Sequence, residues 1–213
     1  MSEIAEIKIK RFLKALKNMD IDSYVFHRKN TLTLSALRKA VRECRKCSLA
    51  ETRRTVVFGE GNSQARLVFV GEAPGEEEDI QGRPFVGRAG KLLDKLIEGI
   101  GLSREEIYIC NVLKCRPPNN RDPKPEEASI CKSYLIAQLE IISPKIICTL
   151  GKHAYNTLLG VDESIIRMRG KLTTFNGIKL LPTYHPSFLL RNAGRMQESI
   201  DDMEKLKHLL KKN

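Results

Sequence analysis

The sequence predicts an α/β fold of three layers, with a central, mainly parallel sheet of four strands between two layers of helices. Short apolar, partly β-branched runs alternate with segments of helical periodicity, and these runs span 67–70, 107–113, 145–150 and 178–183. This alternation is typical of strand–helix–strand units whose parallel sheet is covered on both faces. Polar residues follow the runs, at Glu72, Asn111, Gly151 and His185. Because parallel strands end at the same edge, we expect these residues to converge there.

The composition limits the classes of function. The 213 residues carry a formal net charge of +11. This excess predicts an anionic partner, most commonly nucleic acid, although a solvated basic surface alone would also account for it. No apolar run approaches the length of a membrane span, and the N-terminus lacks the apolar core of a signal peptide. We therefore expect a cytoplasmic protein.

The chain divides into an N-terminal basic helical extension, residues 1–30, and an α/β domain, residues 31–213. In the extension, apolar residues alternate with lysines, at Ile4, Ile7, Ile9, Phe12, Leu13 and Leu16. This pattern predicts an amphipathic helix that packs on the domain or contacts DNA or a partner. A second helix, over 33–44, leads into Cys44 and Cys47.

A long, polar, glycine-rich loop is predicted over 71–87, between the first strand and a helix over 91–99. Loops of this length inside a compact domain are uncommon and usually functional. Two nucleotide-binding motifs fail here: Gly90-Lys91 lacks the upstream glycine of a P-loop, and Gly59-Glu60-Gly61 reaches Gln64 where a third glycine is required. ATP and NAD are therefore disfavoured as ligands.

The remaining elements follow in alternation. Helices are expected over 126–142 and 153–159, an arginine- and lysine-rich stretch surrounds 167–171, and a final helix closes the chain. An arginine- and proline-rich loop over 116–125 follows the second strand.

Six cysteines divide into two groups. Cys110 and Cys148 lie within apolar strands and are expected to be buried as small hydrophobic residues. Cys44 and Cys47 form a Cys-x-x-Cys pair, which Cys115 and Cys131 could approach. Four thiolates without a histidine suit a structural zinc or an iron–sulfur cluster, and spacing alone leaves both open.

Several motifs together resemble the family 4 uracil-DNA glycosylases, which are thermostable iron–sulfur enzymes of archaea and bacteria. They are Gly71-Glu72-Ala73-Pro74-Gly75, Gly82-Arg83-Pro84-Phe85-Val86-Gly87, Asn111 to Pro118, and His185-Pro186-Ser187. The resemblance runs from about Cys44 to Arg191 and does not extend to residues 1–30. It implies that the protein flips uracil out of DNA and hydrolyses its N-glycosidic bond, leaving an abasic site.

The resemblance also implies a role for individual residues. Glu72 would stabilise the sugar cation and orient water, Asn111 would recognise uracil, and Phe85 would stack on the base. His185 would donate a hydrogen bond to uracil O2 as charge develops there. Ala73 and Pro74 complete the predicted uracil-binding set. The other histidines, His27, His153 and His208, have no comparable context.

Supporting and DNA-binding roles are expected as well, and Ser187 stands where many relatives have alanine. Glu78 and Asn120 are expected to support the site, and phosphate contacts are expected from Arg116, Arg121, Lys171, Ser187 and Arg191. The loop after His185 would enter the gap that the flipped nucleotide leaves. A 4Fe-4S cluster is implied on Cys44, Cys47, Cys115 and Cys131, with a structural role.

The expected partner is uracil-containing DNA, single- or double-stranded, with replication or repair proteins as further partners and a monomer as the working unit. Two other classes of function remain. A non-catalytic iron–sulfur DNA-binding module would not need Glu72, Asn111 and His185 together. A structural-zinc protein with an unrelated small-molecule activity would share the sheet and the four cysteines but would be colourless. Within the glycosylases, the range of bases stays open.

Overall fold

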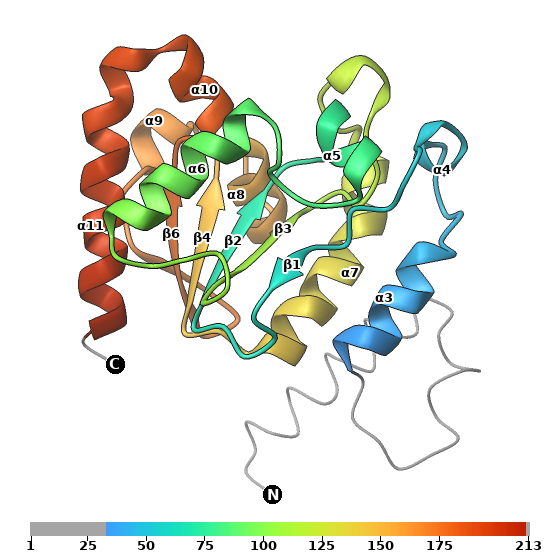
Figure 1. Cartoon of the computed structure of the whole chain (residues 1–213), viewed down its shortest axis with the longest axis horizontal. Coiled ribbons are helices and arrows are strands. Elements are labelled where there is room, and N and C mark those ends of the chain that lie inside the picture. Colours follow the sequence, from blue (N-terminus) through green and yellow to red (C-terminus); the bar gives the residue numbers. More distant parts are fainter. Residues whose placement is uncertain (1–32, 212–213) are drawn as a thin grey trace, which may run out of the picture.

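A parallel four-stranded core lies at the centre of a six-stranded sheet (Figure 1). The computed structural model describes residues 33–211, so the extension predicted over 1–30 lies outside the described residues. The sheet has the strand order β1-β3-β2-β4-β6-β5. Its strands are β1 (Glu60–Gly61), β2 (Leu67–Gly71), β3 (Tyr108–Asn111), β4 (Ile146–Leu150), β5 (Thr173–Phe175) and β6 (Ile178–Thr183).

The inner strands β3, β2, β4 and β6 pair in parallel, which confirms the predicted core of four strands. The sequence did not indicate β1 and β5, which pair antiparallel at the two edges. Both are only two or three residues long, too short to show a period-two pattern.

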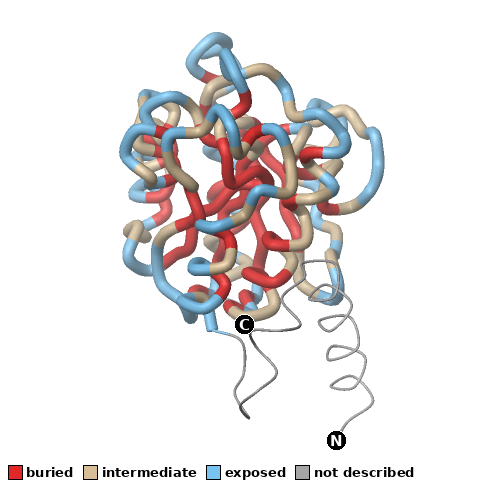
Figure 2. The backbone as a smooth tube through the Cα atoms, turned by 90° about the vertical axis from the view of Figure 1, so that its right-hand side faces the viewer, coloured by how far each residue is buried: buried red, intermediate tan, exposed pale blue. Residues whose placement is uncertain are grey.

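Helices cover both faces of the sheet, as the alternation predicted. Along β2, Leu67 and Phe69 join one apolar cluster while Val68 and Val70 join the other, because successive strand side chains point to opposite faces. The first cluster includes residues from α6 (Arg88–Gly99) and α11 (Met196–Lys211), and the second includes residues from α7 (Pro125–Ile142) and α8 (Lys152–Leu159). Figure 2 shows this buried backbone running through the middle of the molecule.

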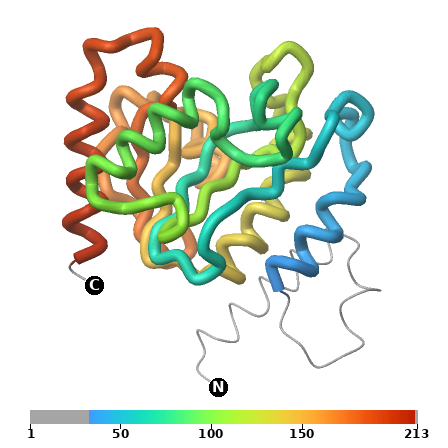
Figure 3. The backbone as a smooth tube through the Cα atoms, viewed as in Figure 1, coloured from blue at the N-terminus to red at the C-terminus, as the bar shows by residue number. Residues whose placement is uncertain are grey.

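The N-terminal helix α3 (Leu34–Arg42) packs beside α7, where Leu37 and Val41 form a separate small apolar cluster with Phe58, Tyr134 and Ala137 (Figure 3). Thr33 caps α3, since its side-chain oxygen accepts a hydrogen bond from the Ala36 amide. The helix ends just before Cys44, and α4 (Leu49–Thr52) follows Cys47. These two elements hold the Cys-x-x-Cys pair against the domain.

Three connections are more structured than the sequence indicated. The glycine-rich loop contains α5 (Glu76–Gln81), and the basic stretch near 167–171 contains α9 (Ile165–Met168). The segment after His185, expected as a loop, forms α10 (Pro186–Arg191) and η2 (Ala193–Arg195), while η1 (Pro118–Asn120) lies in the proline-rich loop. These helices are four to six residues or a single turn, too short for helical periodicity to reveal.

No helix within residues 33–211 is both long and apolar enough to cross a membrane.

Candidate active site

A cleft of about 540 Å³ is lined by residues that follow strands β2, β3, β4 and β6, at their shared carboxyl edge. Most of the residues predicted for the site line it: Glu72, Ala73, Pro74, Glu78, Phe85, Asn111, Asn120, Arg121, His185, Ser187 and Arg191. Arg116 and Lys171 are not among the lining residues in the described part of the chain. Arg116 instead donates to Asn120 Oδ1 at 2.8 Å.

Phe85 is held in a backbone conformation that few side chains adopt, with φ at +53°. The Arg104 guanidinium donates to the carbonyls of Pro84 (2.7 Å) and Phe85 (3.1 Å), which fixes this turn. Gly90 permits the close approach, since a Cβ there would collide with the Phe85 carbonyl. The ring lies 5.6 Å from the His185 ring, so the two form part of one wall of the cleft.

Asn111 ends β3 and is almost fully buried, at 1% exposure. Its Oδ1 finds no hydrogen-bond partner among the described residues. Leaving a buried polar atom unpaired costs free energy, so this oxygen is suited to accept a hydrogen bond from a ligand. Gly71, paired with Asn111 across the sheet, leaves the space open, because a Cβ there would collide with both Oδ1 and the Phe85 ring.

His185 caps α10, and its ring hydrogen bonds fix which nitrogen carries the proton. The Ser187 amide donates to Nδ1 at 3.1 Å, so Nδ1 is the acceptor and the neutral ring carries its hydrogen on Nε2. Burial lowers the pKa of His185 to about 4, and the charge of Arg191 acts in the same direction. The ring is therefore a neutral donor at physiological pH.

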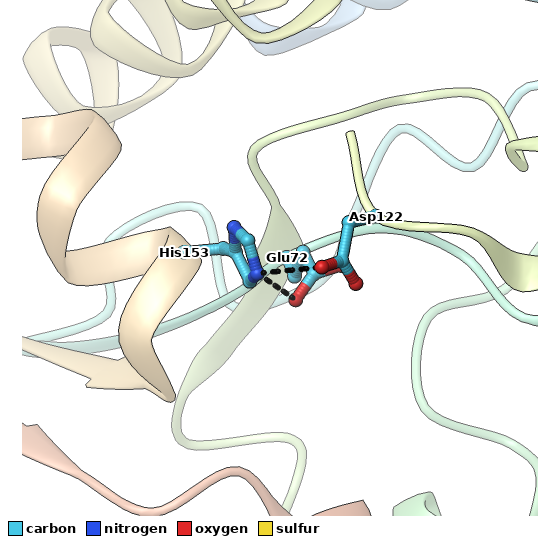
Figure 4. Close-up of side chains that lie close together, drawn as sticks. All are labelled: Glu72, Asp122 and His153. Atoms are coloured by element: carbon cyan, nitrogen blue, oxygen red, sulfur yellow. Dashed lines mark ion pairs between the residues drawn. The ribbon is translucent and has the colours of Figure 1, made fainter. Parts of the chain in front are cut away.

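Glu72 follows β2 and is partly enclosed in the cleft. Figure 4 shows it beside His153 and Asp122, which come from α8 and from the loop after η1. His153 Nε2 lies 3.9 Å from Glu72 Oε2 and 3.5 Å from Asp122 Oδ2. Burial raises the pKa of Glu72, while His153 lowers it and Asp122 raises it further. Neither His153 nor Asp122 was expected at the site.

Glu78 binds both ends of the segment that carries Phe85. Its Oε1 accepts the amides of Val86 and Gly87, each at 2.9 Å, and its Oε2 accepts the Gly75 amide at 3.1 Å. Three backbone donors on one carboxylate close the segment into a defined shape. In this structure Glu78 therefore acts on the cleft through the backbone that it holds.

Arg121 is paired within the protein. Its guanidinium donates to both carboxylate oxygens of Glu127, at 2.6 and 2.9 Å, and Glu127 is buried at the start of α7. This pair lowers the pKa of Glu127. The contact fixes the proline-rich loop against α7, next to Asn120 and Asp122.

Cys44, Cys47, Cys115 and Cys131 line one small pocket between α3, α4 and α7. None of them is in a disulfide. Arg53 Nη1 donates to Cys115 Sγ at 3.1 Å. Burial raises the pKa of the Cys115 thiol, and the contact with Arg53 acts in the opposite direction with a smaller effect. A single tetrahedral zinc would bring its sulfurs to about 3.8 Å from one another. No three of these thiols lie within 4.8 Å of one another, although Glu72, Asp122 and His153 form such a group among the described residues.

Lys114 connects the cysteine pocket to the cleft. It is fully enclosed, and its Nζ donates to the Asn111 carbonyl at 2.7 Å and to Gln138 Oε1 at 2.5 Å. It lines the cysteine pocket together with Cys115 and Cys131. Burial lowers the pKa of Lys114, and the nearby cysteines act in the opposite direction.

Sequence reasoning missed further residues that shape the site. Arg104 and His153 lie outside the motifs, and each reaches the site only through the tertiary fold. Lys114 lies within the motif from Asn111 to Pro118, but no role was expected for it. The adjacency of Lys114 to Cys115 and of His153 to the strand-ending Gly151 were the available signals.

Comparison with known proteins supports one assignment. The family model described as the uracil DNA glycosylase superfamily matches residues 58–211. The Type-4 uracil-DNA glycosylase of Thermotoga maritima is 51% identical over 81% of this chain and 92% of that protein. The enzymes of the same name from Saccharolobus solfataricus and Archaeoglobus fulgidus are 50% and 43% identical, each over 83% of this chain and over 86% and 93% of their own lengths.

Proposed function

Because this chain belongs to the uracil DNA glycosylase superfamily, we propose that its cleft binds a uracil flipped out of DNA and hydrolyses the N-glycosidic bond. The protein is a monofunctional uracil-DNA glycosylase of the type-4 class. The observation that carries the mechanism is the unpaired Asn111 Oδ1, buried beside Phe85 in a cleft that also holds Glu72 and His185.

Asn111 recognises uracil by hydrogen bonds. Its Oδ1 accepts the N3–H of uracil, and the amide nitrogen on the same side chain donates to O4. Cytosine carries an acceptor at N3 and an amino group at C4, so both contacts would be mismatched. Phe85 supplies an apolar face for the base, a contact worth about 1–3 kcal/mol in nucleic-acid binders.

His185 stabilises the leaving group. As the bond from C1′ to N1 breaks, the electron pair moves onto uracil and negative charge develops at O2. The Nε2–H of the neutral ring is available to donate there, since Nδ1 is occupied by the Ser187 amide. A neutral donor keeps its proton, and uracil leaves as an anion held by a hydrogen bond.

Glu72 acts on the sugar side. Its carboxylate stabilises the positive charge that develops at C1′ and orients a water molecule for attack. The water oxygen bonds to C1′, its proton passes by way of the carboxylate or solvent to uracil N1, and the products are free uracil and an abasic site. Water, proton and electron pair therefore balance without a further reactant.

We propose a 4Fe-4S cluster on Cys44, Cys47, Cys115 and Cys131. The four thiols line one pocket together with Arg53 and Lys114. When bound, the cluster would supply a cross-link between the start of the domain, the loop after β3 and α7. The glycosidic reaction moves no electrons, so the role proposed for it is structural.

DNA binding is proposed to rest on Arg191 and Ser187, which line the cleft, together with the basic residues Arg116 and Lys171, which are not among its lining residues. Arg121 would reach a phosphate while its other face stays on Glu127. We propose that the protein works as a monomer on single- or double-stranded DNA.

The test is release of uracil from an oligonucleotide that carries a single deoxyuridine. Wild type should release uracil, Glu72→Gln should lower the rate by 10² or more, and Asn111→Asp should gain activity on cytosine, since a carboxylate accepts from its amino group. Asn62→Asp and Glu105→Gln make the same chemical changes away from the cleft and should match wild type. A brown preparation that binds DNA but releases no uracil would favour the non-catalytic module.

A further inference from the structure

Three segments that are far apart in sequence place His153 and Asp122 next to Glu72. Glu72 follows β2, Asp122 lies in the loop before α7, and His153 is on the first turn of α8. Figure 4 shows the two carboxylates close together, both facing the same side of the imidazole. Its Nε2 is 3.5 Å from Asp122 and 3.9 Å from Glu72, so one nitrogen faces both acids.

We propose that His153 is a positioning residue for the excision reaction, which keeps the enclosed Glu72 carboxylate charged while Asp122 restrains the imidazole from the solvent side. The inference rests on the proposed function, in which Glu72 must be ionised to stabilise the sugar cation. It adds a residue that none of the sequence motifs contains.

The two charged neighbours of Glu72 shift its pKa in opposite directions. Burial raises the pKa of Glu72 and so favours the neutral acid, which would be inactive in the proposed reaction. A protonated His153 lowers this pKa, whereas the Asp122 carboxylate raises it. Histidine is the side chain able to carry a positive charge in the acid range where an enclosed carboxylate titrates, and to lose it above neutrality.

Three other charged residues that line the cleft, Lys152, Arg121 and Glu78, have partners. On α8, Lys152 is paired with Asp162 at 2.9 Å, and Arg121 in the proline-rich loop is paired with Glu127. On α5, Glu78 accepts three backbone amides, and His185 remains neutral above a pKa of about 4. Arg191 lines the same cleft, and its charge acts on His185. Among the described residues, His153 is the basic side chain that pairs with Glu72.

The experiment is a pH profile of the single-turnover excision rate with enzyme in excess over a deoxyuridine oligonucleotide. Saturating enzyme removes the effect of DNA affinity, so the acid limb reports a group in the bound complex. EDTA is included throughout, because the three side chains could also bind adventitious divalent metal.

His153→Gln should move the acid limb to higher pH by about one pH unit, the shift expected for two unit charges about 4 Å apart in a high-dielectric setting. Excision above pH 8 should stay near the wild-type rate. His153→Lys keeps a positive charge and should restore the acid limb. Asp122→Asn should shift the limb to lower pH, and by less, since Asp122 is 80% exposed and screened.

His208→Gln is the matched control, since it removes a histidine from the last turn of α11 and should leave the profile unchanged. The proposal is overturned if wild type excises uracil but His153→Gln has the wild-type acid limb. It is also overturned if His153→Lys shifts the limb as far as His153→Gln does, or if Asp122→Asn shifts it upward. Failure of wild type to excise uracil would instead remove the proposed function itself.

Discussion

At the scale of single residues, the cleft depends on positions that have no side chain. Gly71 lies opposite Asn111 in the sheet, and a Cβ there would meet the Asn111 oxygen and the Phe85 ring. The space where a base would sit is therefore kept open by the backbone of β2.

We expect Gly71→Ala to abolish most uracil excision, because the methyl group forces Phe85 or Asn111 out of place. Gly99→Ala is the matched control, since Gly99 ends α6 and has no heavy atom within 4 Å of an added Cβ. The measurement is the single-turnover excision rate together with the urea midpoint of both variants. Equal rates in the two variants would contradict this account of Gly71.

The lowered pKa of His185 makes the stability of the folded protein depend on pH. Its pKa in the folded protein is about 4, below the usual 6.5, so the unfolded chain binds a proton first as the pH falls. Its contribution to stability is complete above pH 6.5 and is lost progressively between pH 6.5 and 4.

We therefore expect wild type to lose on the order of 1–3 kcal/mol more than His185→Asn between pH 7.5 and pH 4.5. Urea unfolding at both pH values measures the difference. A parallel loss in the two proteins would show that His185 does not contribute to the acid sensitivity.

At the scale of elements, the segment from Gly75 to Gly87 acts as one unit. Its two ends are joined by Glu78, and its middle presents Phe85 to the cleft. The sequence indicated a functional loop here, and α5 was missed because its six residues carry no apolar stripe.

Glu78→Gln should lower the excision rate and expose this segment to proteolysis, because an amide cannot accept from all three backbone donors as the carboxylate does. Glu77→Gln, one position earlier on the exposed face, should change neither property. Limited proteolysis and excision assays on both variants test this. If the Glu78→Gln protein is cut readily but excises uracil at the normal rate, the shape of this segment is not needed for catalysis.

Lys114 joins two elements, β3 and α7, through Asn111 and Gln138. Lys114→Met removes the donor and leaves two buried acceptors unpaired, so we expect a loss of about 2–5 kcal/mol in the free energy of unfolding. Urea unfolding of wild type and variant measures this change in the free energy of unfolding. The exposed Lys124→Met, at the N-terminal cap of α7, is the comparison and should cost under about 1 kcal/mol. If Lys114→Met lowers the free energy of unfolding by no more than Lys124→Met does, the hydrogen bonds of Lys114 to Asn111 and Gln138 contribute little to stability.

At the scale of the whole molecule, the sequence predicted the alternating strands and helices but not the contacts between segments that are distant in the chain. The four parallel strands and their covering helices were visible because buried runs such as 67–70 and 146–150 alternate with helical periodicity. Strand ends identified Glu72, Asn111 and His185, and the strands bring them together as expected.

The other residues of the site become neighbours only when the chain folds. His153 and Asp122 are 31 residues apart in sequence and become neighbours only when α8 packs beside the proline-rich loop. Arg104 reaches back to Phe85 across α6 in the same way. No local sequence pattern encodes such contacts between distant segments, so they could not be predicted from the sequence.

The position of the cysteine pocket along the chain has a consequence for biosynthesis. All four cysteines lie in the first 131 residues, whereas His185 follows 54 residues after Cys131 and after both β4 and β6. During synthesis from the N-terminus, these four thiols thus leave the ribosome before the last wall of the cleft exists. A nascent chain therefore presents all the residues proposed to hold the cluster before it can form the complete cleft.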